Sequence, residues 1–134
     1  MAIIETDIVI ALASKKDVHH NEVKKLLEKV NVLLSPYTLI ELDLIILSGN
    51  LVVKIPDFYD ALNDTFRYYN VSILPPDTSH LNTAWLIREK YGLTFFDSLH
   101  AATALERKDI LISYDKRYAI VKNLKYVHPS SYKI

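Results

Sequence analysis

The stretch that decides the fold is LTFFDSLHAATALERKDILISYDK, residues 93–116. Its first half predicts a helix, with Thr94 as the N-cap and Asp97 three residues later in an arrangement close to a capping box. The alanines that follow give this helix a thin face that can lie close to a sheet. The second half contains Ile110 to Ser113, a short apolar run typical of a strand buried on both faces. Because Asp97 begins the helix and Asp115 follows the strand, both are expected in one crevice at a sheet edge.

Short apolar runs alternate with helical patterns along the rest of the chain. Strands are expected at residues 2–6, 32–34, 71–74, 110–113 and 126–128. Helices are expected at residues 8–13, 19–30 or 21–30, 36–47, 56–69, up to 91 after a cap at Asp77 or Thr78, 94–105 and 117–121. Ser35 is expected to cap the third of these helices, with Pro36 at its first position. The alternation predicts a single α/β domain, residues 1–134, with a mostly parallel central sheet flanked by helices on both faces.

Composition limits the classes of function. Half of the 134 residues are hydrophobic and the net charge is zero, so the chain is globular and has no general field that attracts nucleic acid, although a local basic patch is compatible. The absence of cysteine excludes disulfides and thiolate chemistry and fits a reducing compartment. The sequence has no signal-peptide pattern and no apolar run of membrane-spanning length. A cytoplasmic protein without a membrane partner is therefore expected.

Four carboxylates are the candidate functional groups. Asp7 and Asp115 are expected after strands and Asp97 in the first turn of a helix, while Glu41 lies on a helix that is apolar almost all round. A buried carboxylate costs several kcal/mol unless it meets a cation or hydrogen bonds, so Glu41 is expected to face a metal, an arginine or a wet cleft. Each acid also has a simpler interpretation. Asp97 suits a helix dipole, Asp115 and Asp7 suit caps, and Glu41 suits pairing with a buried arginine.

Taken together, four acids from four elements can converge at one edge of the sheet. Such a cluster repels itself unless it binds a cation, and oxygen-only ligands favour Mg²⁺ or Mn²⁺ over zinc. The five histidines lack the spacing of a zinc site; His100 is either packed in its helix or touches the acidic cluster. Carboxylates that hold a divalent cation suit hydrolysis of a phosphodiester. Lys116 and Arg117 either contact backbone phosphates or form solvated surface.

The segments that carry these acids resemble PIN domains, and within them the VapC-type toxins of prokaryotic toxin–antitoxin systems. The resemblance covers almost the whole chain: a strand ending in Asp7, then Leu39–Leu42 around Glu41, Asp97–Ala104 as the most specific match, and Ile112–Tyr118 around Asp115. It implies a metal-dependent single-strand ribonuclease, usually dimeric, that a cognate antitoxin inhibits. It also implies that Asp7, Glu41, Asp97 and Asp115 bind the metal, with Ser113 in support.

The chain departs from the family pattern after the first acid. The family commonly has Thr or Ser and then Asn directly after its first aspartate, whereas Ile8 and Val9 follow Asp7. A supporting hydroxyl is therefore either missing or supplied by Thr6. This departure bears on the rate and the choice of substrate more than on the fold.

The sequence leaves several functions open. The ribonuclease is either a toxin that acts on RNA and binds an antitoxin or a housekeeping RNA-processing nuclease. A catalytically inactive PIN-like binding module is an alternative, although all four acids are present, and a metal titration discriminates between them. A receiver domain phosphorylated on aspartate fits less well, because no lysine ends the last strand.

Nine tyrosines and broad apolar helix faces, such as that of residues 56–69, predict a homodimer.

Overall fold

The fold was analysed in a computed structural model, which describes residues 1–132. The five strands are β1 Ala2–Ile4, β2 Val32–Leu34, β3 Ser72–Ile73, β4 Ile110–Ile112 and β5 Tyr126–Val127. The six α-helices are α1 Thr6–Ala13, α2 His20–Lys29, α3 Thr38–Leu47, α4 Asp57–Tyr68, α5 Thr78–Tyr91 and α6 Phe95–Arg107. Two short 3₁₀ helices follow, η1 Lys116–Ile120 and η2 Pro129–Ser131.

The strands form one sheet in the order β3-β2-β1-β4-β5, and every neighbouring pair among them is parallel. β1 lies in the middle, where Ile3 pairs with Leu33 of β2 on one side and with Leu111 of β4 on the other. Connections between parallel strands must cross over a face of the sheet, and the helices make these crossings. The predicted parallel sheet is therefore confirmed.

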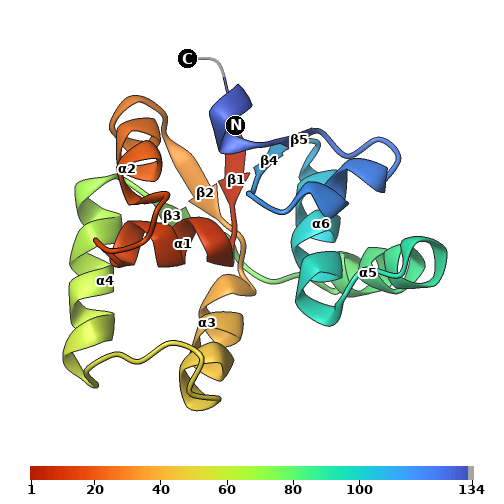
Figure 1. Ribbon diagram of the computed structural model, residues 1–134. Coiled ribbons are helices and arrows are strands. Elements are labelled where there is room, and N and C mark those ends of the chain that lie inside the picture. The colour runs from red at the N-terminus through yellow and green to blue at the C-terminus, as the bar shows by residue number, and fades with distance from the viewer. Residues whose placement is uncertain (133–134) are drawn as a thin grey trace.

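Helices cover both faces of the sheet, as Figure 1 shows. Side chains of β1 alternate between the faces, so Ala2 and Ile4 pack in the core with α1, α2 and α4, whereas Ile3 packs with α5 and α6 on the opposite face. The alanines of α6 are fully buried there, which lets this helix lie close to the sheet. The predicted three-layer α/β arrangement is confirmed.

Three local predictions were wrong, each for a physical reason. The first strand ends at Ile4 and not at Thr6, because the Glu5 carboxylate accepts a hydrogen bond from the Asp7 amide and so starts α1. Asp7 therefore lies in the first turn of a helix. Ser35 makes no cap, since α3 begins only at Thr38. Thr94 occupies the N-cap position of α6 without a capping hydrogen bond from its side chain, so the expected capping box is absent from this helix.

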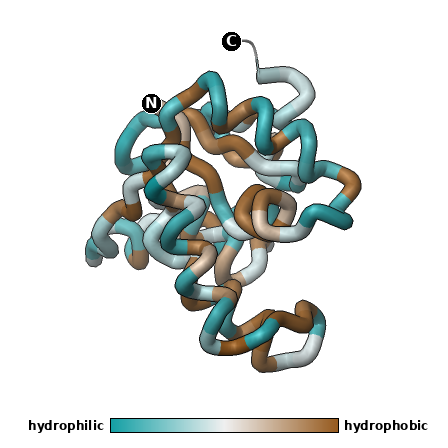
Figure 2. The backbone as a smooth tube through the Cα atoms, turned by 90° about the vertical axis from the view of Figure 1, so that its left-hand side faces the viewer, coloured by the Kyte–Doolittle hydropathy of each residue, from teal (hydrophilic) through white to brown (hydrophobic). Residues whose placement is uncertain are grey.

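α3 and α5 each carry three large apolar residues on the surface, and those of α5 are Leu81, Trp85 and Leu86. On α3, Ile40, Leu44 and Leu47 are all exposed, and brown hydrophobic positions alternate with teal hydrophilic ones in the lowest part of the tube in Figure 2. None of the helices within residues 1–132 is both long enough and apolar enough to cross a membrane.

Candidate acidic active site

The candidate site lies where the carboxyl ends of the parallel strands meet the first turns of the helices. Glu5 directly follows β1, Ser35 follows β2 and Ser113 follows β4. Glu41 and Asp97 lie in the first turns of α3 and α6. Short strand-to-helix connections hold all these groups at one edge of the sheet, which is where α/β proteins place ligands.

Glu41 is bound from two sides through one carboxylate oxygen. The Thr6 hydroxyl donates to Glu41 Oε1, and His100 Nε2 lies 2.8 Å from the same oxygen. Burial alone would raise the pKa of the Glu41 carboxyl, but the hydrogen bond and charge of His100, together with Thr6, lower it below its ordinary value. Glu41 is therefore held as a carboxylate whose other oxygen, Oε2, is left for another partner.

Glu5 is the most deeply buried acid of the site, with only 4% of its surface exposed. Its Oε1 accepts from the Asp7 amide at 2.8 Å, and its Oε2 accepts from the Tyr118 hydroxyl at 2.8 Å. Burial raises the pKa of the Glu5 carboxyl from 4.5 to about 7, because the nearby His100 only partly offsets the loss of hydration. Glu5 forms no ion pair with a lysine or arginine within residues 1–132.

Asp7 points toward the segment that follows β4. Its Oδ2 accepts from Ser113 Oγ and from the Tyr114 amide, each at 2.8 Å. Its Oδ1 is buried and has no hydrogen-bond partner within the described chain. Burial also raises the pKa of the Asp7 carboxyl. A buried oxygen without a partner is costly, so Oδ1 is a position that a water or a cation would satisfy.

Asp97 and Asp115 share one arginine. Arg117 Nη2 lies 2.6 Å from Asp115 Oδ2 and 3.2 Å from Asp97 Oδ2. The hydrogen bond from Arg117 lowers the pKa of the Asp115 carboxyl below its ordinary value. Asp115 also caps η1 by accepting from the Arg117 amide, so its simpler role as an N-cap is real. Asp97 Oδ1 is 3.2 Å from the Tyr118 hydroxyl, which thereby bridges Asp97 and Glu5.

The predicted acids therefore lie at one edge of the sheet, but they form two groups that contact different partners. Ligand atoms of Glu5, Glu41 and His100 lie within 4.8 Å of one another. The second group, Asp97 and Asp115, is joined to this first group through Tyr118.

The residues present fit a divalent cation. The donors are mainly carboxylate oxygens, which are the ligands of Mg²⁺ and Mn²⁺, and Asp7 Oδ1 is buried without a partner. In the described part of the chain, the positive charge that contacts these acids comes from Arg117 and from His100 when protonated. Arg117 is 67% exposed, so water weakens its direct ion pairs with Asp97 and Asp115 and a cation can displace it.

One member of the site, Glu5, was not predicted from the sequence, and the structure decides the role of a second, His100. The sequence places Glu5 within the expected strand at residues 2–6. The signal for its role is the dipeptide Glu5-Thr6, which matches the family pattern of an acid followed by Thr or Ser. With Glu5 as the first acid, Thr6 follows it as the pattern expects, and Asp7 takes the place of the usual Asn. The sequence allows His100 either to pack within its helix or to touch the acidic cluster; the ring is fully buried and also contacts Glu41.

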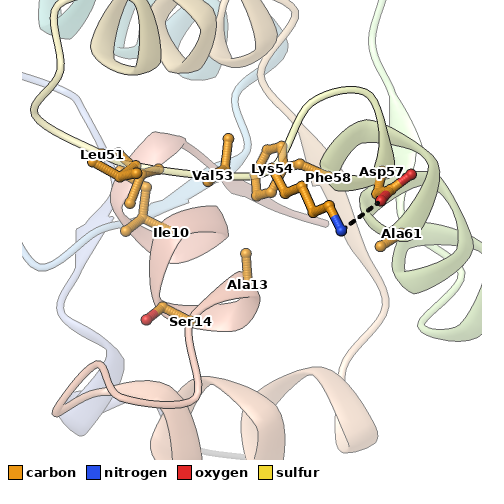
Figure 3. A pocket seen from close by; sticks show the side chains of 10 residues that line it. Ile10, Ala13, Ser14, Leu51, Val53, Lys54, Asp57, Phe58 and Ala61 are labelled. Carbon is orange, nitrogen blue, oxygen red and sulfur yellow. Dashed lines mark ion pairs between the residues drawn. The ribbon is translucent and has the colours of Figure 1, made fainter.

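A separate apolar cavity of about 370 Å³ lies between α1, residues 51–54 and α4 (Figure 3). Its wall consists mainly of Ile10, Ala13, Leu51, Val53 and Phe58. The charged pair on its rim, Lys54 and Asp57, is widely exposed and 4.0 Å apart. The cavity lacks the clustered carboxylates of the sheet edge and is not the candidate catalytic site.

The fold and the site define a small α/β protein with an acidic cluster at the carboxyl edge of a parallel sheet. The sequence model of the PIN domain family matches residues 2–124. The chain therefore belongs to the PIN domain family. No curated protein sequence matches it significantly.

Solved structures share this fold. The chain is similar to a structure of VapBC2 from Rickettsia felis bound to a promoter DNA fragment, with 18% identity, a TM-score of 0.69, and 95% of this chain and 97% of that chain covered. A toxin–antitoxin complex from Klebsiella pneumoniae has 22% identity and a TM-score of 0.69 with both chains fully covered. DNA-bound VapBC from Salmonella typhimurium has 17% identity and a TM-score of 0.69 over 96% and 97%.

Proposed function

We propose that this protein is a Mg²⁺- or Mn²⁺-dependent endoribonuclease that cleaves single-stranded RNA and acts as the toxin of a type II toxin–antitoxin pair. The observation that carries the proposal is the convergence of acids from separate elements at one sheet edge: Glu5 after β1, Glu41 on α3, Asp97 on α6 and Asp115 after β4. Membership of the PIN domain family, whose members are generally nucleases, supports the same reaction class.

The proposed site differs from the sequence-based set at one position. We assign the first acidic position to Glu5, because it directly follows β1 and its carboxylate lies within 4.8 Å of Glu41 and His100. Asp7 accepts a hydrogen bond from Ser113 at its Oδ2. We propose that Asp7 either holds neighbouring residues of the site in place or binds the cation through its Oδ1. Glu41, Asp97 and Asp115 keep their proposed role as metal-binding acids, and Thr6 and Ser113 remain supporting residues.

A bound divalent cation would supply a Lewis acid that polarises the phosphodiester and lowers the pKa of an attacking water. The residues of the chain prepare the place for it. Thr6 and His100 fix one oxygen of Glu41. Tyr118 fixes the distance between Glu5 and Asp97. Once released from the two aspartates, Arg117 is free to contact the negatively charged RNA backbone.

The test is cleavage of labelled RNA by purified protein. Unstructured RNA should be cut in Mn²⁺ or Mg²⁺, whereas a fully paired RNA of the same sequence and a single-stranded DNA should resist. EDTA should stop cleavage and added Mn²⁺ should restore it. Cleavage that continues unchanged in EDTA would contradict the metal mechanism. Failure to bind Mn²⁺ at all would favour an inactive PIN-like binding module.

An antitoxin partner is supported by the similar solved structures, which contain toxin–antitoxin complexes. We propose that part of the antitoxin covers the acidic cleft and that both proteins act in the cytoplasm, where RNA is available. A housekeeping RNA-processing nuclease is the alternative with the same chemistry. Expression of the protein alone should arrest growth if it is a toxin, and co-expression of an adjacent small gene should relieve the arrest.

A homodimer is also proposed, because exposed apolar side chains gather on α3 and α5. Ile40, Leu44 and Leu47 lie on α3, and Trp85 and Leu86 lie on α5. Exposed apolar area of this kind is typical of an interface. Light scattering at micromolar concentration should give twice the 15.4 kDa mass of one chain, and a monomer under these conditions would contradict the proposal.

A further inference from the structure

His100 is completely buried although it carries two polar ring nitrogens. It lies on α6 one turn after Asp97, so the same helix that contributes an acid to the site also contributes this ring. Both nitrogens have a partner: Nδ1 is 2.6 Å from Ser35 Oγ, and Nε2 is 2.8 Å from Glu41 Oε1. The ring therefore links the end of β2 to an acid on α3.

We propose that His100 is a positioning residue that holds the Glu41 carboxylate in the orientation needed for the divalent cation, with Ser35 fixing the ring from behind. This inference rests on the proposed metal-dependent function. Ser35 belongs to the same unit because its buried hydroxyl faces His100 and does not cap α3.

The contacts explain how the unit works. Glu41 has three side-chain torsions, so its carboxylate can rotate within the cleft unless a partner fixes it. Its side chain is 21% exposed, so most of its surroundings are protein groups that can act as such a partner. His100 and Thr6 both hold Oε1, and this leaves Oε2 directed to a different partner. Residues that orient a metal-binding carboxylate change metal affinity by about tenfold or more when they are removed.

Two substitutions of His100 distinguish the contributions of its two ring nitrogens. Counted in bonds from Cβ, the amide nitrogen of glutamine matches Nε2 of histidine, whereas that of asparagine matches Nδ1. His100→Gln can therefore still donate to Glu41, and His100→Asn can reach only toward Ser35. The two variants are matched in polarity and both bury an amide, but asparagine is one methylene smaller, so the stability of each variant is measured alongside its metal binding.

The measurement is the Mn²⁺ dissociation constant, obtained from the loss of the free Mn²⁺ electron paramagnetic resonance signal. His100→Gln should bind within about threefold of wild type, His100→Asn at least about tenfold more weakly, and Ser35→Ala between them. In a Glu41→Gln background, His100→Asn should cause no further loss, because both changes act through one carboxylate. Thermal unfolding without metal checks that each variant is folded.

Specific results would overturn the inference. Equal weakening by His100→Gln and His100→Asn would show that the ring is not acting through its bond to Glu41. A nitrogen coupling to bound Mn²⁺ in pulsed resonance of the wild-type protein would make His100 a direct ligand. Wild-type protein that binds no Mn²⁺, or that binds it as well after Glu41→Gln, would instead contradict the proposed function. If either His100 variant fails to fold, Ser35→Ala tests the same inference, because Mn²⁺ binding as tight as in wild type would contradict it.

Discussion

Arg117 and Asp97 are 20 residues apart in sequence, yet Arg117 Nη2 lies 3.2 Å from Asp97 Oδ2 and joins η1 to the first turn of α6. The same guanidinium also binds Asp115. The site thus holds a positive group of its own between two acids that are proposed to bind a cation. Because Arg117 is largely exposed, water and salt screen these pairs and make them easy to exchange.

Replacing Arg117 by glutamine should tighten Mn²⁺ binding. The arginine competes for Asp97 and Asp115, and exposed ion pairs carry roughly 0.5–1 kcal/mol, which corresponds to about two- to fivefold in affinity. Isothermal titration with Mn²⁺ measures the change. Lys116→Gln is the matched control, since it removes an equal charge from the adjacent residue and should leave the affinity nearly unchanged. Weaker binding by Arg117→Gln would mean that the arginine arranges the carboxylates for the metal.

The stability of the metal-free protein should fall as pH rises from about 4.5 to about 7, because burial raises the pKa of Glu5 across that interval. The folded protein keeps the Glu5 proton where the unfolded chain has lost it, so folding is favoured below pH 4.5 and loses this advantage as pH rises through 7. The difference is on the order of 3 kcal/mol. Urea unfolding in EDTA at several pH values measures it.

Glu5→Gln provides the comparison for this pH dependence. The variant has no titrating group at this position, so its unfolding free energy should change less between pH 4.5 and pH 7 than that of wild type. Parallel curves for the two proteins would show that Glu5 does not titrate in this interval. The pKa of Asp7 is also raised, which gives a change of the same sign, and Asp7 interacts with Glu5, so the comparison measures the two neighbouring acids together.

The alanine face of α6 also makes a direct prediction about the fold. Ala102 has no exposed surface in the core with α5, so Ala102→Leu must displace neighbours and should cost about 1–3 kcal/mol of unfolding free energy. Ala61 on α4 is exposed, and Ala61→Leu should change stability by less than about 0.5 kcal/mol. Thermal unfolding of both variants measures the contrast. Equal effects would indicate that α6 is less tightly packed than described.

The architecture was predictable because its signals are local and repeated. Apolar runs bounded by turn residues gave all five strands, and Gly92, in a left-handed conformation, ends α5 as its position indicated. Asp77 and Asp115 are the N-caps of α5 and η1. The sequence allowed either Asp77 or Thr78 to cap the first of these helices, and it allowed Asp115 to be a cap or a metal ligand. Each of these features depends on residues within a few positions of each other, so it can be recognised in a single sequence.

The site was less predictable because its contacts join residues far apart in sequence. Glu5 and Tyr118 are separated by 113 residues, and no local pattern indicates their hydrogen bond. The boundary between β1 and α1 depends on whether Glu5 extends a strand or caps a helix, and only its bond to the Asp7 amide decides this. His100 likewise depends on two partners from other elements, Ser35 and Glu41.

Glu41 and Asp43 provide the sharpest test of the site, because both are acids on α3. Positions two apart on an α-helix differ by about 200°, so the two carboxylates point in nearly opposite directions. Glu41 turns toward Thr6 and His100, whereas Asp43 is exposed and accepts from the Tyr59 hydroxyl at 2.6 Å. Only Glu41 therefore belongs to the acidic cluster at the sheet edge.

Glu41→Gln should lower Mn²⁺-dependent cleavage of single-stranded RNA by at least about a hundredfold, comparable to the loss of one principal stabilising contact. Asp43→Asn keeps an acceptor for Tyr59 and should remain within a few-fold of wild type, roughly under 1 kcal/mol in activation free energy. Circular dichroism first checks that both variants are folded. If Asp43→Asn abolishes cleavage while Glu41→Gln stays active, the acids at the sheet edge are not the catalytic site, because the loss would then follow the carboxylate on the opposite side of α3.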